Sequence, residues 1–394
     1  MTSWIAESLF IFSLIALIYI YLGYPLLVYL VSRIRPREVK RGPVEPTVTI
    51  LITAYNEERD IRQKLENTLK IDYPSEKLEI LAASDGSTDR TDEIVKEFAG
   101  RGVRLFRQEG RVGKTVTQNN AVAVASGQII LFSDATTMYP ENVLREILPA
   151  FADESVGCVA GKLIYVDRNE TTIGQGAKSY WNYETFLKEA ESRACSLIGA
   201  SGCLYAVRRE AYRPMYPEAC SDFLIATVLY AQGLRTIYEP NAVCTEETNN
   251  KSDKELRMRV RVISQTFTDL WRNRRMMNPL RSGFYSIELI SHKLLRYTVP
   301  LFLIALFLSS AYLASASVIF QLFFVLQAGF YLVAMLAWFV ERSGGRLGLL
   351  SMPLYFSLAN LASLIGFYKF LRGERYARWE PIRETAGSTH QPEG

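Results

Sequence analysis

Acidic side chains follow three segments whose composition predicts β-strands. Glu57 and Glu58 come after the first of these strands, Asp85 after the second, and Asp134 after the fourth strand of the chain. Because the carboxyl ends of neighbouring parallel strands open onto one crevice, we expect these carboxylates to share a cleft with Lys114. One carboxylate can accept the N–H of a uracil, another can hold a divalent cation on a diphosphate, and the lysine adds a positive contact. The set predicts a nucleotide-sugar site.

Several other chemistries lack the residues they need. The chain has only two histidines, His292 and His390, which are too few for a Ser/His/Asp triad or a histidine-rich metal centre. No G-x-G-x-x-G follows the first predicted strand, and the Gly-Lys-Thr run at 113–115 has Gln108 where a P-loop requires glycine. A net charge of +4 is too small and too dispersed to predict nucleic-acid binding.

The polar part of the chain alternates short β-branched runs with segments of helical period. The predicted strands are 48–53, 78–84, 103–107, 128–133 and 156–165, and predicted helices include those near 114–125 and 141–152. This alternation is typical of an α/β fold with a mostly parallel sheet and helices on both faces. We expect Asn56 to cap the helix that follows the first strand.

Three uncharged stretches predict four membrane spans. Residues 8–32 exceed the roughly 20 residues that cross the hydrocarbon core. Residues 297–340 are long enough for two spans joined by a turn near 314–317, and residues 347–368 are a further candidate. Just before these C-terminal spans, residues 283–296 mix apolar and polar groups at helical spacing, which predicts an amphipathic helix on the membrane surface.

The charges beside the first span predict its orientation. Arginine and lysine residues are concentrated at 33–41, which predicts a cytoplasmic polar domain in a multi-pass protein of the cell membrane. The five cysteines include no C-x-x-C pair and are expected to be reduced, which agrees with that side. Four spans place the tail outside although it is basic. Either the last segment is re-entrant, or the tail lies outside against the charge tendency.

The chain therefore divides into five predicted parts. They are an N-terminal span with its basic flank (1–42), a polar catalytic domain (43–280), an interfacial helix (281–296), about three C-terminal spans (297–371) and a polar tail (372–394).

Seven short stretches of the polar domain are together typical of one family. They are 53–58, 84–89, Gly113-Lys114 with Asn119, 132–135, 180–184, 199–209 and 221–223. With these stretches in this order, the sequence resembles the membrane-bound family 2 glycosyltransferases, the group that contains cellulose, hyaluronan and chitin-oligosaccharide synthases. The resemblance covers roughly residues 47–295. It implies a GT-A fold, a Rossmann-like mixed sheet, with transmembrane helices at both ends.

The resemblance also implies roles for individual residues. Those expected at the nucleotide sugar are Ala54, Tyr55, Glu57, Asp85, Lys114, Ser133, Asp134, Arg259 and Arg261. Among them, Asp85 would meet the uracil, and Asp134 would be the first member of a metal-binding D-x-D that takes Mg²⁺ or Mn²⁺. The acceptor would lie near Trp181, Ser201 and Gly202, although Trp181 could equally be a core aromatic. Asp222 would be the catalytic base; at a helix start, an aspartate is also a common cap.

Two motifs depart from the family pattern. The D-x-D has become Asp134-Ala135-Thr136, which removes one carboxylate and predicts looser metal coordination. The Q-R-x-R-W motif appears as 258–262, where Arg259 and Arg261 remain but the glutamine and the tryptophan are gone. The loss of that tryptophan puts the making of long polymers in doubt. The other arginines of this region are equally compatible with a basic face near anionic lipid.

These features predict an inverting glycosyltransferase that moves a sugar from a UDP-sugar to a glycan or glycolipid acceptor at the cytoplasmic membrane face. A polyprenyl-phosphate glycosyltransferase is the alternative within the same enzyme class. An inactive scaffold of an envelope polysaccharide complex is the alternative from another class. Three C-terminal segments offer little material for a translocation channel, so export of a polymer would require a partner or a homo-oligomer.

Overall fold

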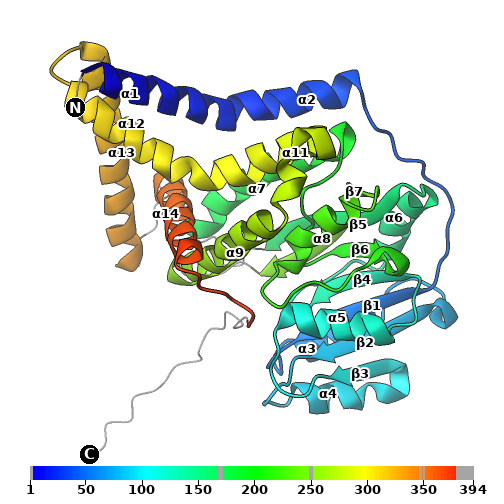
Figure 1. Ribbon diagram of the computed structural model, residues 1–394. Helices are drawn as coiled ribbons and strands as arrows, with labels where there is room; N and C mark the ends of the chain where they lie inside the picture. Colours follow the sequence, from blue (N-terminus) through cyan, green and yellow to red (C-terminus); the bar gives the residue numbers. More distant parts are fainter. Residues whose placement is uncertain are drawn as a thin grey trace, which may run out of the picture.

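A mixed seven-stranded sheet forms the centre of the polar domain (Figure 1). The computed structural model describes residues 3–166, 172–247, 252–343, 345, 348 and 351–378. The strands are β1 (Val48–Ala54), β2 (Leu78–Ser84), β3 (Val103–Arg107), β4 (Ile129–Asp134), β5 (Val156–Val166), β6 (Tyr205–Arg208) and β7 (Arg235–Glu247). Their order is β3-β2-β1-β4-β6-β5-β7, with β6 antiparallel to both of its neighbours and all other pairs parallel.

The central strand β1 shows why this sequence forms a sheet with two covered faces. All seven of its residues are buried, as expected for a parallel strand packed on both sides. Ile50 and Ile52 face one hydrophobic cluster, while Leu51 faces the other. The register aligns Thr53 with Asp134 on β4. The strand ends that carry the polar side chains therefore lie at one edge, and the predicted α/β fold is confirmed.

Helices cover both faces of the sheet (Figure 1). They are α3 (Ile61–Thr68), α4 (Thr91–Glu97), α5 (Lys114–Val124), α6 (Val143–Ile147), α7 (Thr172–Ala194) and α8 (Ser221–Tyr230). Helix α9 (Ser252–Arg272) and the short α10 (Pro279–Ser282) follow β7 and pack on other helices. Short 3₁₀ turns occupy 75–77, 99–101, 148–152, 209–211 and 274–277. The clusters on the two sheet faces include residues of α3, α4 and α6 on one side and of α5 and α8 on the other.

Asn56 does not cap a helix, contrary to the expectation from the sequence. Helix α3 begins only at Ile61, and Asn56 has a φ of 54° in the left-handed region, which asparagine tolerates better than most residues. Its Oδ1 accepts hydrogen bonds from the backbone N–H groups of Thr88 (2.7 Å) and Asp89 (3.4 Å). Asn56 therefore ties the loop after β1 to the loop after β2.

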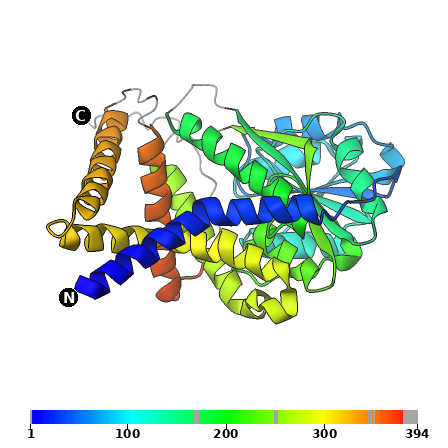
Figure 2. The same ribbon diagram turned by 90° about the horizontal axis from the view of Figure 1, so that it is seen from above.

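Four helical stretches among the described residues are long and apolar enough to cross a membrane. The first, 3–34, consists of α1 (Ser3–Ile18), a π-helical turn (Tyr19–Gly23) and α2 (Tyr24–Ile34). The second, 284–313, consists of α11 (Phe284–Leu289), a π-helical turn (Ile290–Leu295) and α12 (Arg296–Leu313). The other two are α13 (Val318–Arg342) and α14 (Ser351–Leu371). The turn between α12 and α13 falls at 314–317, as predicted. Figure 2 shows α1 crossing α12, with which it makes an apolar contact.

Residues 283–296 differ from the predicted surface helix. They lead directly into α12 as one helical stretch, and Glu288 and His292 are buried. His292 Nδ1 lies 2.6 Å from Oε1 of Glu191, and its Nε2 lies 3.2 Å from Oε2 of Glu184, both on α7. The hydroxyl of Tyr24 also donates to Glu191, at 2.5 Å. The polar groups that suggested a membrane surface thus join α2, α7 and the 284–313 helix to one another.

Helix α9 connects the polar domain to the last apolar helix. It packs along α14, where Gly366 allows a close approach: a Cβ at this position would lie 3.0 Å from Cγ2 of Ile263. The Phe267 ring stacks against that of Phe370. After α14 the chain turns back toward the polar domain (Figure 1), where the carbonyl of Tyr376 accepts a hydrogen bond from Nε2 of Gln265 at 2.8 Å.

Candidate active site

A buried carboxylate shapes the turn at the start of α5. Asp85 is fully buried and its Oδ1 accepts hydrogen bonds from the backbone N–H of Val112 (2.8 Å) and from Oγ1 of Thr117 (2.9 Å). The backbone N–H of Gly113 lies 3.0 Å from both carboxylate oxygens. A carboxylate at a helix N-terminus is also favoured by the helix dipole. The structure thus uses Asp85 to position Lys114, the first residue of α5, and contact with a uracil stays a prediction.

Lys114 joins the end of β4 to the start of α8. Its ammonium binds Oδ1 of Asp134, and both side chains are partly exposed. Burial lowers the pKa of Lys114, but the negative charges of Asp134 and Asp222 outweigh burial and leave that pKa raised. Three groups predicted for the site from separate strand and helix ends therefore interact electrostatically in one place.

Asp222 does not act as a helix cap. The N-cap position of α8 is Cys220, and no side chain caps this helix end. Oδ1 of Asp222 accepts from the adjacent backbone N–H of Phe223 at 3.1 Å and from the thiol of Cys220 at 3.1 Å. A capping aspartate would instead accept from an N–H two or three residues ahead. The capping alternative for this residue is therefore not supported.

The loop before β6 approaches Asp222 closely at Gly202. A Cβ on Gly202 would lie 3.0 Å from Oδ2 of Asp222, and the backbone N–H of Ala200 donates to the carbonyl of Asp222 at 2.8 Å. Ser201 Oγ accepts a hydrogen bond from Nζ of Lys188 on α7 at 2.6 Å. Gly202 thus lies beside Asp222, and contact of Ser201 and Gly202 with an acceptor stays a prediction. The side chain of Trp181 lies outside the described residues.

The two arginines of α9 meet different groups. Burial lowers the pKa of Arg261, and the negative charges of Asp222 and Asp134 oppose that effect, so Arg261 lies within electrostatic range of both carboxylates. Arg259 binds Oε1 of Glu255 at 2.7 Å and the hydroxyl of Tyr355 on α14. Residues two apart on a helix point about 200° apart, so the two side chains leave α9 on different faces. Contact of Arg259 with the nucleotide sugar stays a prediction.

The loop after β1 forms another wall of the cleft. The carbonyl of Ala54 accepts from the backbone N–H of Asp85 at 2.9 Å, which joins the ends of β1 and β2. The guanidinium of Arg111 lies 4.1 Å from the centre of the Tyr55 ring. Glu57 is buried, and its backbone N–H donates to Oγ1 of Thr91 at 2.7 Å. Arg111 was not predicted for the site, because nothing in its local sequence distinguishes it from the surrounding basic residues.

A carboxylate of β7, that of Glu246, lies beside the altered D-x-D motif. Oγ1 of Thr136 donates to Oε1 of Glu246 at 3.0 Å. Burial and the negative charge of Asp134 raise the pKa of Glu246 to about 7. Beside them, Ser133 is buried in β4 and its Oγ donates to the carbonyl of Asp134 at 3.1 Å. Glu246 was also missed from the sequence, because 110 residues separate it from Thr136.

The donor set at this edge fits a divalent cation that shares its coordination with a diphosphate. Within the described ranges, no group of three or more histidine, cysteine, aspartate or glutamate side chains could hold a metal alone. Mg²⁺ in nucleotide sites, however, is commonly bound by one or two carboxylates together with phosphate oxygens and water. Asp134, which here binds the ammonium of Lys114, provides one such carboxylate at the end of β4.

The segment that follows α14 reaches the turn held by Asp85. Gly113 has a φ of 100°, and a Cβ at this position would lie 1.9 Å from the carbonyl oxygen of Ala377. Ala377 therefore packs directly against this turn, although it lies far from the other site residues in the sequence. No pattern in the tail predicts this contact.

The class of protein follows from this arrangement. A solved structure, the mannosyltransferase PcManGT from Pyrobaculum calidifontis, superposes with a TM-score of 0.71 at 23% identity, covering 93% of this chain and 100% of that one. It shows that the protein has a GT-A type glycosyltransferase fold. Residues 49–215 match the family model described as Glycosyl transferase family 2, and the chain therefore contains a family 2 glycosyltransferase domain. The predicted GT-A fold is confirmed, and the family match agrees with the predicted glycosyltransferase domain.

Curated relatives carry related names but share only part of their length. The chain is 34% identical over 135 residues to the probable glycosyltransferase YdaM of Bacillus subtilis, covering 32% of each chain. It is 26% identical to the beta-monoglucosyldiacylglycerol synthase of Nostoc sp., covering 42% of this chain and 36% of that protein. The N-acetylglucosaminyltransferase of Bradyrhizobium diazoefficiens is 23% identical over 64% of this chain and 55% of the relative. The chain thus spans between a third and about half of these relatives.

Substitution of Gly113 by alanine should weaken nucleotide binding. Its φ of 100° and ψ of 155° are almost restricted to glycine, and such strain costs of order 1–3 kcal/mol. The new Cβ would also collide with the carbonyl of Ala377. We expect Gly113→Ala to lower UDP affinity by about tenfold in calorimetric titration. Gly100→Ala is the control, since no atom lies within 4 Å of its Cβ position; equal UDP affinity in both variants would contradict this role of the turn.

Proposed function

We propose that the protein transfers a sugar from a UDP-sugar to a hydroxyl group of a glycan or glycolipid at the cytoplasmic face of the membrane, with inversion at the anomeric carbon. The observation that carries the proposal is the ion pair of Lys114 with Asp134 at the carboxyl edge of the sheet, within electrostatic range of Asp222 and Arg261. Two cations suit a diphosphate, and two carboxylates suit a metal ligand and a base.

The donor would lie with its diphosphate at the start of α5. The backbone at this helix N-terminus and the ammonium of Lys114 favour an anion, and the guanidinium of Arg261 adds a second positive charge. Tyr55 and Arg111 form the wall available to the nucleoside. A Mg²⁺ or Mn²⁺ ion on Asp134 would neutralise the charge that develops on the leaving diphosphate. The fold relative from Pyrobaculum was solved with GDP-Man and Mn²⁺.

Asp222 would serve as the base. Its carboxylate takes the proton of the acceptor hydroxyl while the acceptor oxygen bonds to the anomeric carbon and the bond from that carbon to the phosphate oxygen breaks. Attack from the face opposite the diphosphate inverts the anomeric configuration. Because Gly202 has no side chain, the loop before β6 can pack directly against Oδ2 of Asp222.

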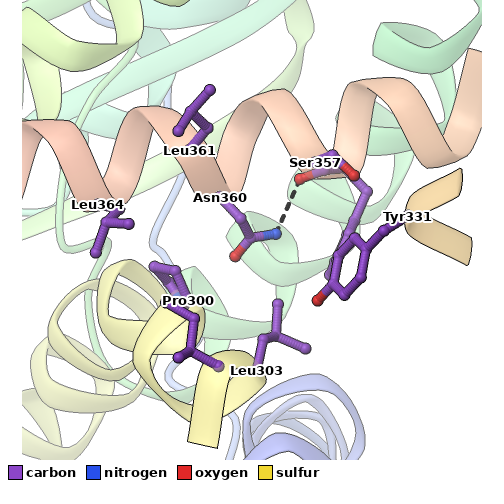
Figure 3. Close-up of a pocket in the computed structure, with 9 residues that line it drawn as sticks. Pro300, Leu303, Tyr331, Ser357, Asn360, Leu361 and Leu364 are labelled. Atoms are coloured by element: carbon purple, nitrogen blue, oxygen red, sulfur yellow. Dashed lines mark hydrogen bonds between the residues drawn. The ribbon is translucent and has the colours of Figure 1, made fainter. Parts of the chain in front are cut away.

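An apolar cavity among the membrane helices supports a lipid acceptor. It has a volume of about 310 Å³ and lies between α12, α13 and α14 (Figure 3). Its lining includes Pro300, Leu303, Tyr331, Asn360 and Leu364. Such a cavity suits an alkyl or isoprenyl chain better than a sugar. It favours a glycolipid acceptor, and it equally favours the second candidate function, transfer to a polyprenyl phosphate. One curated relative is named for the synthesis of a glucosyl lipid.

Replacing Asp222 by asparagine should stop transfer while leaving donor binding intact. A general base typically contributes about 10² to 10⁴ in rate, so we expect at least about a hundredfold loss in the rate of UDP release with acceptor present. Affinity for UDP should stay within about twofold of the wild-type value. Asp72→Asn is a matched control, since Asp72 is exposed and pairs with Arg145 on the surface. Wild-type turnover by Asp222→Asn would place the base elsewhere, and an inactive wild-type chain would favour the scaffold interpretation.

The proposed orientation has a test of its own. The basic residues at 33–41 follow the first apolar helix, so the sheet domain should lie inside the cell. Protease added to sealed right-side-out vesicles is expected to leave residues 43–280 intact, and to digest them once detergent opens the vesicles. Cleavage within 43–280 before opening would place the domain outside and separate it from cytosolic nucleotide sugars.

A further inference from the structure

Glu246 lies beside the position where the D-x-D motif of this chain lacks a carboxylate. The motif is Asp134-Ala135-Thr136, with a hydroxyl where a second acid would stand. The hydroxyl of Thr136 donates to Oε1 of Glu246 at 3.0 Å. We infer that Glu246, carried by β7, is the second carboxylate ligand of the divalent cation. This inference rests on the proposed nucleotide-sugar transfer and names a residue of its metal site.

The backbone fixes Glu246 in this position. Residues Met138 and Thr245 exchange two backbone hydrogen bonds of 2.9 Å in an antiparallel bridge between the loop after β4 and the end of β7. On its other side, β7 pairs with β5, where Tyr165 is the partner of Glu246. The backbone at Glu246 is thus held between β5 and the loop after β4, and is not part of a free loop. A ligand on rigid backbone pays little ordering cost when a cation binds.

A second acid strengthens the cation site at this edge. Mg²⁺ and Mn²⁺ prefer oxygen ligands, and one carboxylate with a neutral hydroxyl is a weak set for a dication that must also neutralise a diphosphate. Asp134 is already paired with the ammonium of Lys114. With Glu246 the edge offers two carboxylates and the Thr136 hydroxyl, which leaves the remaining positions to phosphate oxygens and water.

A purely structural role for Glu246 predicts a different outcome on substitution. The hydrogen bond from Thr136 needs only an acceptor oxygen, and the amide oxygen of glutamine supplies one. A glutamine would therefore keep the end of β7 in place but remove the negative charge from the cation site. Glu246→Gln separates the two roles, and the unfolding temperature of the variant reports directly on the structural one.

The experiment measures Mn²⁺ binding rather than turnover. The full-length protein in detergent is saturated with UDP and titrated with Mn²⁺, and free Mn²⁺ is followed by electron paramagnetic resonance. We expect Glu246→Gln to weaken Mn²⁺ binding by at least about tenfold, because even substitutions behind a ligand cost about 10 to 100-fold in metal affinity. Glu93→Gln, an exposed acid on α4, is the matched control and should bind Mn²⁺ as the wild type does.

A second variant restores the missing charge from the motif itself. Thr136→Asp added to Glu246→Gln rebuilds two carboxylates at the edge and should recover most of the lost Mn²⁺ affinity. Mn²⁺ affinity of Glu246→Gln within twofold of wild type, while Asp134→Asn loses binding, would overturn the inference and leave the proposed function standing. Failure of the wild-type protein to bind UDP or Mn²⁺ at all would remove the proposed function and the inference with it.

Discussion

The buried carboxylate of Asp85 sets the geometry on which the rest of the cleft depends. Asp85 directly follows β2, at the carboxyl ends of the strands. Its carboxylate accepts hydrogen bonds from the backbone N–H groups of Val112 and Gly113 and from the hydroxyl of Thr117. These bonds connect the sharp turn to the first turn of α5. Without these bonds, the buried N–H groups of the turn would lack partners, at about 1–3 kcal/mol each. Because the turn is held, Lys114 begins α5 at a fixed distance from the end of β4.

The cleft is also joined physically to the apolar helices. Helix α9 carries Arg261 on the face toward Asp222 and Asp134, while Arg259 contacts Tyr355 on α14. The chain then returns from α14 and places Ala377 against Gly113. Two contacts therefore join α14 and the segment after it to the elements that carry the candidate site.

Local patterns in the sequence were enough to predict the elements that carry most of the site. Strands β1, β2 and β4 are continuous β-branched or apolar runs, and the acids at their ends follow from the parallel arrangement. Non-local features were not predictable. Strand β6 lies antiparallel between β4 and β5, and Glu246 reaches the motif only through the pairing of β7 with distant segments.

Tertiary contacts modify two expectations from the sequence. Polar groups at 283–296 predicted an amphipathic helix on the membrane surface, yet His292 finds its partners on α7, which periodicity cannot reveal. Arg259 shares a motif with Arg261, and it binds Glu255 and Tyr355 on α14 as well. In both cases tertiary contacts decided which neighbours a polar group of a helix meets.

The central claim is that one edge of the sheet holds the diphosphate of a nucleotide sugar. The most direct measurement is a structure of the full chain determined by electron cryomicroscopy with UDP and Mn²⁺ bound. The account predicts diphosphate density between Lys114 and Arg261, with Mn²⁺ density in contact with Asp134. Nucleotide density away from the ends of β1, β2 and β4, or a diphosphate there whose metal does not touch Asp134, would contradict it.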